Sequence, residues 1–348
     1  EIWWDQRSSI LDPFLKIINN YVKPDFGIDF AYEDIRKNKG LTFIHRKTEN
    51  QDIYFVSNIQ DRNISYDIDF RVSNKEVWNW NPYNGEIKQL FNFSKSANGT
   101  KVPIKLAPWE STFIVFEQDI QTSYVNKTNM NKITGLNNRV VSAEIIHNGS
   151  YYLNIVNNLE DIFITKDIED IPAPLLINGK WKITFESEHF PKIEKEVNNL
   201  SSWSDTPDTK YFSGTGVYEI TFNLPDDYIK KDLKLELDLG KIGNIGEVFV
   251  NGKNAGVIWM KGQKCNVTNL VRKGKNQLTV LVTNTNINRV SAFSGITPLP
   301  DDMLNKYGKD HPDNRYPREF GFEPLPPSGL MGPVKICPVR ILKIDINN

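Results

Sequence analysis

The sequence predicts a mainly β protein of two antiparallel β-sandwich domains, preceded by one short helix. Apolar and polar residues alternate over 218–224, 233–239 and 278–282, which is the period of strands with one buried face. An Asn251-Gly252 pair separates two further strand-like segments, and Asn-Gly strongly favours a two-residue hairpin turn. Residues 41–116 also consist of short strand-like segments without helical patterns between them. These three observations together favour stacked antiparallel sheets.

Residues 1–26 are expected to form a short strand and then an amphipathic helix. Apolar side chains recur at helical spacing from Ile10 to Val22, and Pro24 ends the pattern. The chain opens almost directly on Ile2-Trp3-Trp4, without a methionine or a polar leader. We therefore interpret it as part of a longer polypeptide.

The strand patterns suggest how the rest of the chain is divided. Residues 27–120 are predicted to form a small β-sandwich. Residues 121–175 contain bridging strands and a polar loop, which either complete this first sandwich or lead to the second. The second domain is predicted over residues 176–348. Within it, residues 285–332 are rich in Pro, Gly and Asn and predict a long loop before a last strand.

Composition limits the classes of partner. The 348 residues include 42 Lys and Arg against 43 Asp and Glu, without a basic block that would follow a phosphate backbone, so we expect no nucleic acid partner. No window approaches the roughly 18 apolar residues of a bilayer span, so we expect no membrane partner. Cys265 and Cys337 are too few for a disulfide scaffold or a thiolate metal site, although one bridge between them is possible.

Signals for catalysis, metals and cofactors are weak. The four histidines are scattered without the spacing of a zinc motif, and residues 61–72 lack the glycine and the bidentate acid of a calcium loop. Glycoside hydrolysis needs two facing carboxyl groups. Glu319, beside Arg318 and between aromatic residues, stands out among the acids, but a structural ion pair explains it better. We predict no catalytic residue, no metal and no cofactor.

Six residues make up the predicted carbohydrate-binding set. Sugars are held by flat aromatic faces against their C–H surfaces and by planar polar groups against their hydroxyls. Residues of these types that lie in or beside predicted loops are Trp203, Trp259, Arg289, Phe293, Arg318 and Glu319. The alternative interpretation is that the two tryptophans fill the ends of the sandwich.

Several segments resemble known glycoside hydrolases. KYFSGTGVYEITFNLP, LKLELDLGKIGNIGEVFVNGKNAGVIW and VTNLVRKGKNQLTVLVTN resemble the galactose-binding-like jelly-roll of family 2-type glycoside hydrolases. More closely, LTFIHRKTENQDIYFVSN, NPYNGEI and the region from GKWKITFE to Asn288-Arg289 resemble the C-terminal β-domains of glycoside hydrolase family 106, the α-L-rhamnosidase-like enzymes. The similarity extends from about Val22 onward. The chain departs from the family pattern just before Asn288-Arg289, where the family tends to have a tryptophan.

This resemblance implies a fold and a role. The second domain would be a galactose-binding-like jelly-roll, and catalysis would belong to a (β/α) barrel of about 250 residues elsewhere in the parent chain. Residues 1–26 would be a helical remnant of that catalytic region. The chain would then be the non-catalytic C-terminal part of a polysaccharide-degrading enzyme, bracing the barrel, binding carbohydrate and located in the periplasm or secreted. The alternatives are a stand-alone carbohydrate-binding module and a purely structural interaction domain.

Overall fold

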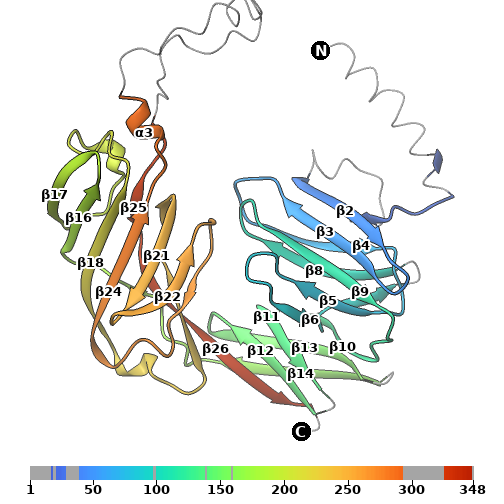
Figure 1. The fold of residues 1–348 in the computed structure, drawn as a ribbon. Coiled ribbons are helices and arrows are strands. Elements are labelled where there is room, and N and C mark those ends of the chain that lie inside the picture. The colour runs from blue at the N-terminus through green and yellow to red at the C-terminus, as the bar shows by residue number, and fades with distance from the viewer. Residues whose placement is uncertain are drawn as a thin grey trace, which may run out of the picture. The chain divides into compact units, whose positions relative to one another are not determined.

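The computed structural model describes residues 17–18, 21–28, 39–96, 99–137, 139–157, 160–292 and 325–346. Antiparallel strands dominate these ranges and confirm the predicted mainly β class (Figure 1). The chain divides into two compact units: unit 1 comprises Glu1–Ile171 and Val339–Asn348, and unit 2 comprises Pro172–Pro338. Most of the helix predicted over residues 10–22 lies outside the described residues, although Ile17 and Ile18 are helical.

Two sheets of unit 1 enclose an apolar core. In β3 (Asp52–Asn58), Tyr54 and Val56 are fully buried, while the alternate residues Ile53, Phe55 and Ser57 are partly exposed. Phe70 and Phe116 contact the Tyr54 ring from two other strands. One sheet has the order β2-β3-β9-β5-β6, with β2 (Leu41–Lys47), β9 (Ser111–Glu117), β5 (Glu76–Trp80) and β6 (Ile87–Gln89). The facing sheet has the order β1-β4-β8-β7, with β1 (Phe26–Gly27), β4 (Ile64–Phe70), β8 (Gly99–Leu106) and β7 (Ser94–Ser96).

A second apolar core of unit 1 is built by residues that follow this sandwich. Val141, Leu153 and Ile155 are fully buried in it. A three-stranded sheet contributes β10 (Ser123–Thr128), β13 (Gly149–Asn157) and β14 (Glu160–Ile168), and another sheet contributes β11 (Lys132–Leu136), β12 (Val140–Ile145) and the end of β26 (Lys335–Asp345). The segment whose role the sequence left open therefore has a core of its own within unit 1.

Unit 2 forms a second sandwich. Its larger sheet has the order β17-β16-β18-β24-β21-β22 (Figure 1), with β17 (Phe190–Val197), β16 (Trp181–Ser187), β18 (Thr215–Leu224), β24 (Gly274–Thr283), β21 (Ile245–Val250) and β22 (Lys253–Ile258). The other strands of unit 2 are β15 (Leu175–Leu176), β19 (Leu233–Asp238), β23 (Cys265–Asn266), β20 (Lys241–Gly243), β25 (Gly329–Gly332) and the start of β26. Leu235 and Leu237 of β19 share a core with Val280 and Val282 of β24, which confirms the predicted alternation.

Short helical turns interrupt the strands of unit 2: η1 (Trp203–Asp205), η2 (Asp226–Tyr228) and α3 (Ile287–Val290). The segment expected to be a long loop over 285–332 therefore has α3 near its start and β25 at its end, and residues 293–324 between them lie outside the described residues. Both cysteines are free, because β19 separates the strands that carry them. Among the described residues, no helix has the length and apolar character needed to cross a membrane.

The turn between β21 and β22 has the geometry that its sequence predicts. Val250 pairs with Lys253, so the loop contains two residues, Asn251 and Gly252. Their φ angles are 52° and 77°, both in the left-handed region that this type of hairpin turn requires.

Gly252→Ala is expected to destabilise unit 2 by about 1 kcal/mol, because a Cβ is disfavoured at positive φ. Urea unfolding of the variant and the wild type measures the difference. Gly135→Ala is the matched control, since Gly135 has no positive φ and an added Cβ would meet Ser142 at an ordinary 3.7 Å. Equal losses in the two variants would contradict the prediction.

Candidate functional site

Two of the predicted carbohydrate-binding residues lie at the same end of the larger sheet of unit 2. Thr283, the last residue of β24, pairs with Ile245, the first residue of β21. β22 runs antiparallel to β21 and ends beside it at Ile258. Trp259, which follows β22, and Arg289, in the helical turn that follows β24, therefore leave the sheet at one end. We call this end the loop end of unit 2.

Trp259 is 50% exposed and lies in a loop that the Gln263 side chain closes. The backbone N–H groups of Trp259 and Met260 both donate to Gln263 Oε1, each at 3.0 Å, which fixes the backbone under the indole. Ile245 and Val257, on the two paired strands that lead to this loop, are 48% and 52% exposed. The loop end thus presents a half-exposed aromatic ring next to strands with exposed apolar side chains.

Arg289 lies in α3, and its backbone N–H donates to Ser213 Oγ at 3.1 Å. The residue before it, Asn288, is only 1% exposed and donates through Nδ2 to the carbonyl of Lys210 at 3.3 Å. Ser328 Oγ donates to Asn288 Oδ1 at 3.5 Å. The guanidinium of Arg289 is therefore carried by a helical turn whose backbone and neighbouring side chain are tied to the sandwich.

Asn284, which is partly buried, extends these polar contacts into a network. Its Nδ2 donates to the carbonyl of Phe212 at 2.9 Å and to Ser328 Oγ at 3.2 Å, and its Oδ1 accepts from the Gly214 N–H at 3.0 Å. Ser328 N–H in turn donates to Ser202 Oγ at 3.0 Å. Buried polar groups need such partners, and full pairing makes their arrangement rigid. The network therefore joins the chain after β24 to the chain before β25.

Trp203 is 2% exposed, and its indole lies in the core of unit 2. Its Nε1 donates to the Tyr218 hydroxyl at 2.5 Å, and its ring meets Phe185 and Phe212 edge to face. Burial raises the pKa of Tyr218 to about 12, so this hydroxyl stays neutral. In this structure Trp203 has no ring face open to a glycan and matches the alternative interpretation, in which the tryptophan fills the end of the sandwich.

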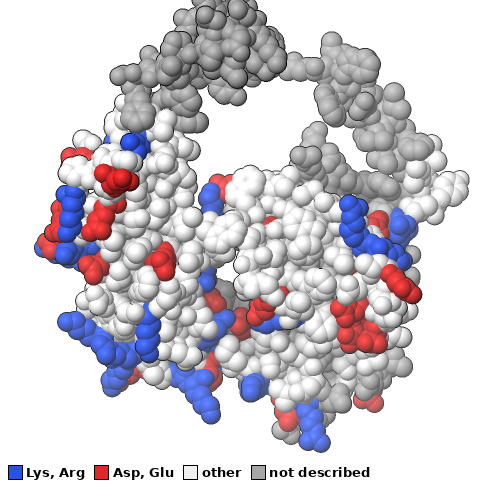
Figure 2. Space-filling view, viewed as in Figure 1, with Lys and Arg blue, Asp and Glu red and all other residues white. Residues whose placement is uncertain are grey.

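Phe293, Arg318 and Glu319 lie outside the described residues. The structure therefore brings Trp259 and Arg289 to one end of unit 2 and places Trp203 in the core at that end. Among the described residues, no group of three or more His, Cys, Asp and Glu side chains is arranged to hold a metal ion. On the face shown in Figure 2, acidic and basic side chains lie among one another.

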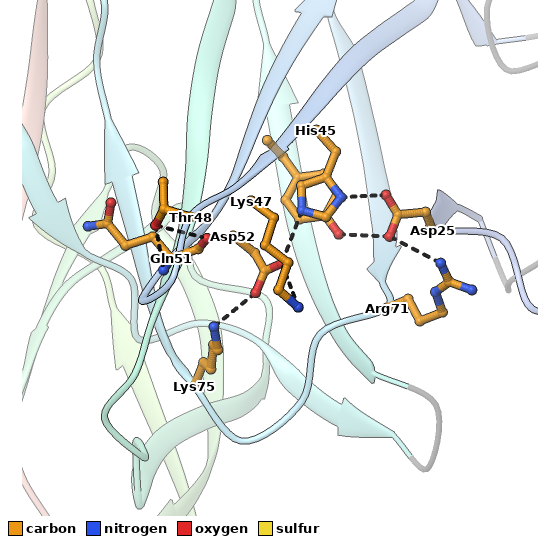
Figure 3. A network of polar contacts seen from close by, with 9 residues as sticks. Asp25, His45, Lys47, Thr48, Gln51, Asp52, Arg71 and Lys75 are labelled. Atoms are coloured by element: carbon orange, nitrogen blue, oxygen red, sulfur yellow. Dashed lines mark hydrogen bonds and ion pairs between the residues drawn. The ribbon is translucent and has the colours of Figure 1, made fainter.

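A polar cluster that the sequence did not indicate lies in unit 1 (Figure 3). His45 Nδ1 is 2.7 Å from Asp25 Oδ2, and its Nε2 is 3.1 Å from Asp52 Oδ1. The imidazole also stacks on the Tyr54 ring, with 4.0 Å between the ring centroids. Lys75 Nζ donates to Asp52 Oδ2 at 2.9 Å. We call these residues the His45 cluster.

Neighbouring positive charges and hydrogen bonds stabilise the charged form of Asp52 in the His45 cluster. Burial alone would raise the pKa of Asp52, but the hydrogen bond and charge of Lys75, with the charge of Lys47 and the hydrogen bond to His45, hold it below its ordinary value. Burial and then the charge of Asp25 raise the pKa of Tyr54. Both carboxylates are bound by neighbouring side chains, so the cluster fastens the start of β1 to β2 and β3.

Comparisons with known proteins agree with this fold. A sequence model of the family described as alpha-L-rhamnosidase matches residues 13–95. A protein of Formosa agariphila named "Putative beta-glucuronidase" is 33% identical over 195 residues, which are 51% of this chain and 17% of that protein. The structure of a rhamnosidase from Novosphingobium sp. superposes with a TM-score of 0.60 and 23% identity, covering 95% of this chain and 26% of the rhamnosidase.

The chain thus spans about a quarter of the rhamnosidase structure and about a sixth of the Formosa protein. The likeness to the rhamnosidase structure establishes a shared fold, and the family model adds a match in sequence. The chain is homologous to glycoside hydrolases, and it resembles the α-L-rhamnosidases of glycoside hydrolase family 106.

Proposed function

We propose that this chain is the non-catalytic C-terminal part of a polysaccharide-degrading, α-L-rhamnosidase-like glycoside hydrolase, and that unit 2 binds carbohydrate at its loop end. The resemblance to the family supports the first part. In the described ranges, the strands do not alternate with helices as a catalytic (β/α) barrel requires. The chain would brace the barrel of its parent enzyme, and the same resemblance supports a periplasmic or secreted location.

The observation that carries the carbohydrate-binding part is the placement of Trp259 and Arg289. A half-exposed indole on a loop held by Gln263 offers a flat face to the C–H surface of a sugar ring. The Arg289 guanidinium carries five N–H donors suited to sugar hydroxyls. Both residues leave the same end of one sheet, which supports a single site that includes both.

Calorimetric titration with rhamnose-containing oligosaccharides tests the loop end. Trp259→Ala and Arg289→Ala are each expected to weaken binding at least tenfold, which corresponds to about 1.4 kcal/mol. Trp109→Ala is the matched control, because Trp109 is 51% exposed but belongs to unit 1. Unchanged affinity in both unit 2 variants would reject the site. Release of the aryl group from aryl rhamnosides by the purified chain would contradict the non-catalytic role.

One observation favours a second candidate function, a purely structural interaction. Ile17 and Tyr21, which precede β1, are 60% and 84% exposed. Apolar side chains exposed in one short segment are typical of a surface that packs against another part of a protein. If this is the main role, the chain will bind none of the oligosaccharides and will dimerise through this segment, and Tyr21→Ser will abolish the dimer in sedimentation measurements.

A further inference from the structure

The outer face of the three-stranded sheet of unit 1 exposes aromatic rings that no role described above uses. In β14, Ile162 and Ile164 pack against the second core of unit 1, so the residues between and beside them point away from it. Phe163 is one of these and is 66% exposed. It pairs with Asn154 of β13, and the neighbouring outward residue of β13 is Tyr152. We call this surface the Phe163 face.

The two rings of the Phe163 face stack on each other and together form an aromatic platform. The ring centroids of Tyr152 and Phe163 are 6.1 Å apart, and the ring planes differ by only 17°. β13 and β14 pair without a register shift, from the pair Gly149 and Ile168 to the pair Asn157 and Glu160. Both rings are therefore carried by a regular antiparallel strand pair. An aromatic ring held by a stacked neighbour in this way loses little conformational entropy when a ligand covers it.

Polar side chains line one side of the platform across all three strands. Asn126 Nδ2 donates to Asn154 Oδ1 at 2.9 Å, and Asn154 Nδ2 donates to Asp161 Oδ1 at 3.4 Å. This amide–amide–carboxylate row keeps its members in place and leaves free capacity, because each amide has a second N–H and the carboxylate has a second oxygen. The charge of Asp161 also acts on Tyr124, whose pKa is raised by burial and then by this carboxylate. The row therefore offers both donors and acceptors beside the rings.

The chemistry of the face selects one kind of ligand. An apolar protein partner would bury Asp161 and the two amides away from water, which costs free energy unless each finds a new hydrogen bond. A polyanion would meet Asp161 and Asp167, and Lys127 is the cation that pairs opposite Asn154. A neutral pyranose instead has a C–H surface for the ring and hydroxyls around its rim for the amides and the carboxylate. Because it carries no charge, it also avoids the repulsion that the excess of Asp161 and Asp167 over Lys127 would impose on an anionic ligand.

We propose that the Phe163 face is a second carbohydrate-binding surface, specific for a neutral glycan, in which a sugar ring stacks on Phe163 and its hydroxyls bond to Asp161 and the Asn126–Asn154 amides. The surface belongs wholly to unit 1. It is independent of Trp259 and Arg289, so it does not require the loop end of unit 2 to bind carbohydrate.

Affinity electrophoresis of the full chain in gels containing neutral galactan, xyloglucan or acidic polygalacturonate tests the proposal. All variants are made in a Trp259→Ala background, so that any contribution of the loop end is removed first. We expect the background protein to be retarded by at least one neutral polysaccharide and not by polygalacturonate. Phe163→Ala should weaken this retardation at least tenfold in apparent Kd, Asp161→Ala should also weaken it, and Phe163→Tyr should preserve it.

Trp109→Ala serves as the control for loss of an exposed aromatic residue from unit 1, and thermal melting verifies that each variant is folded. Asp161→Ala gives an independent reading if Phe163→Ala does not fold. Retardation that is unaffected by both substitutions, or absent from all neutral gels, overturns the proposal. Stronger retardation by polygalacturonate than by the neutral gels also overturns it. A dimer that Phe163→Ala dissociates, without any glycan binding, would show instead that the face contacts a second copy of the chain.

Discussion

Trp203→Ala is expected to destabilise unit 2 by about 3–5 kcal/mol, the usual cost of truncating a fully buried aromatic side chain to alanine. The indole is 2% exposed, meets Phe185 and Phe212 edge to face, and donates to the Tyr218 hydroxyl. The surroundings cannot easily close over the space, because Gly216 and Gly329 lie against the ring through their backbones. Hydrogen exchange of the β18 and β24 amides, together with calorimetric melting, measures the loss in the free energy of unfolding of unit 2.

Trp259→Ala provides the contrast within the same unit. The Trp259 ring is 50% exposed, so its removal should change the free energy of unfolding by no more than about 0.5 kcal/mol. The two variants should therefore have different effects: Trp203→Ala lowers stability, and Trp259→Ala lowers glycan affinity. Similar small losses of stability in both variants, with glycan binding reduced by Trp203→Ala alone, would show that Trp203 acts at the ligand surface instead.

The sequence predicts the strands well because their signal is local. In β19 and β24, alternate residues such as Leu237 and Val280 are buried, and the Asn251-Gly252 turn adopts the backbone that its two residues favour. A buried face and a turn are properties of a few adjacent residues, so they can be recognised without knowledge of the rest of the fold.

The environment of Trp203 depends on contacts that are far apart in the sequence. Residues of its type between strands are as typical of a ligand loop as of a core, and the sequence cannot distinguish the two. The structure decides because Ser202 accepts from Ser328, 126 residues later, and Gly329 packs on the indole. Contacts between residues so far apart in the chain leave no periodic pattern in the sequence.

The His45 cluster shows how much of a site can be recovered from strand register. β2 and β3 form a hairpin in which His45 pairs with Tyr54, so Asp52 lies two residues along on the same face. A register argument from the predicted hairpin could therefore have placed His45 beside Asp52. It could not have placed Asp25, which precedes the hairpin and reaches His45 through the pairing of β1 with β4.

Asp52→Asn is expected to destabilise unit 1 by about 2 kcal/mol near neutral pH. The carboxylate is buried and receives hydrogen bonds from Lys75 and His45, so its loss leaves the ammonium of Lys75 without its charged partner. Removing one member of a buried ion pair costs about 3–5 kcal/mol, and the partial exposure of the Lys75 side chain, 21%, reduces this figure. Urea unfolding followed by exchange of the β3 amides measures the loss.

The pH dependence of this difference separates charge from packing. The pKa of Asp52 is lowered in the folded state, so its contribution is present above the unfolded value of about 3.9 and is lost as the pH falls through the lower folded value. The gap between wild type and Asp52→Asn should therefore be full at pH 6 and shrink below about pH 4. Asp67→Asn, which alters an exposed carboxylate of β4, should leave stability within about 0.5 kcal/mol at every pH. If the gap between wild type and Asp52→Asn stays constant down to pH 2.5, the carboxylate stabilises unit 1 through its shape and not through its charge.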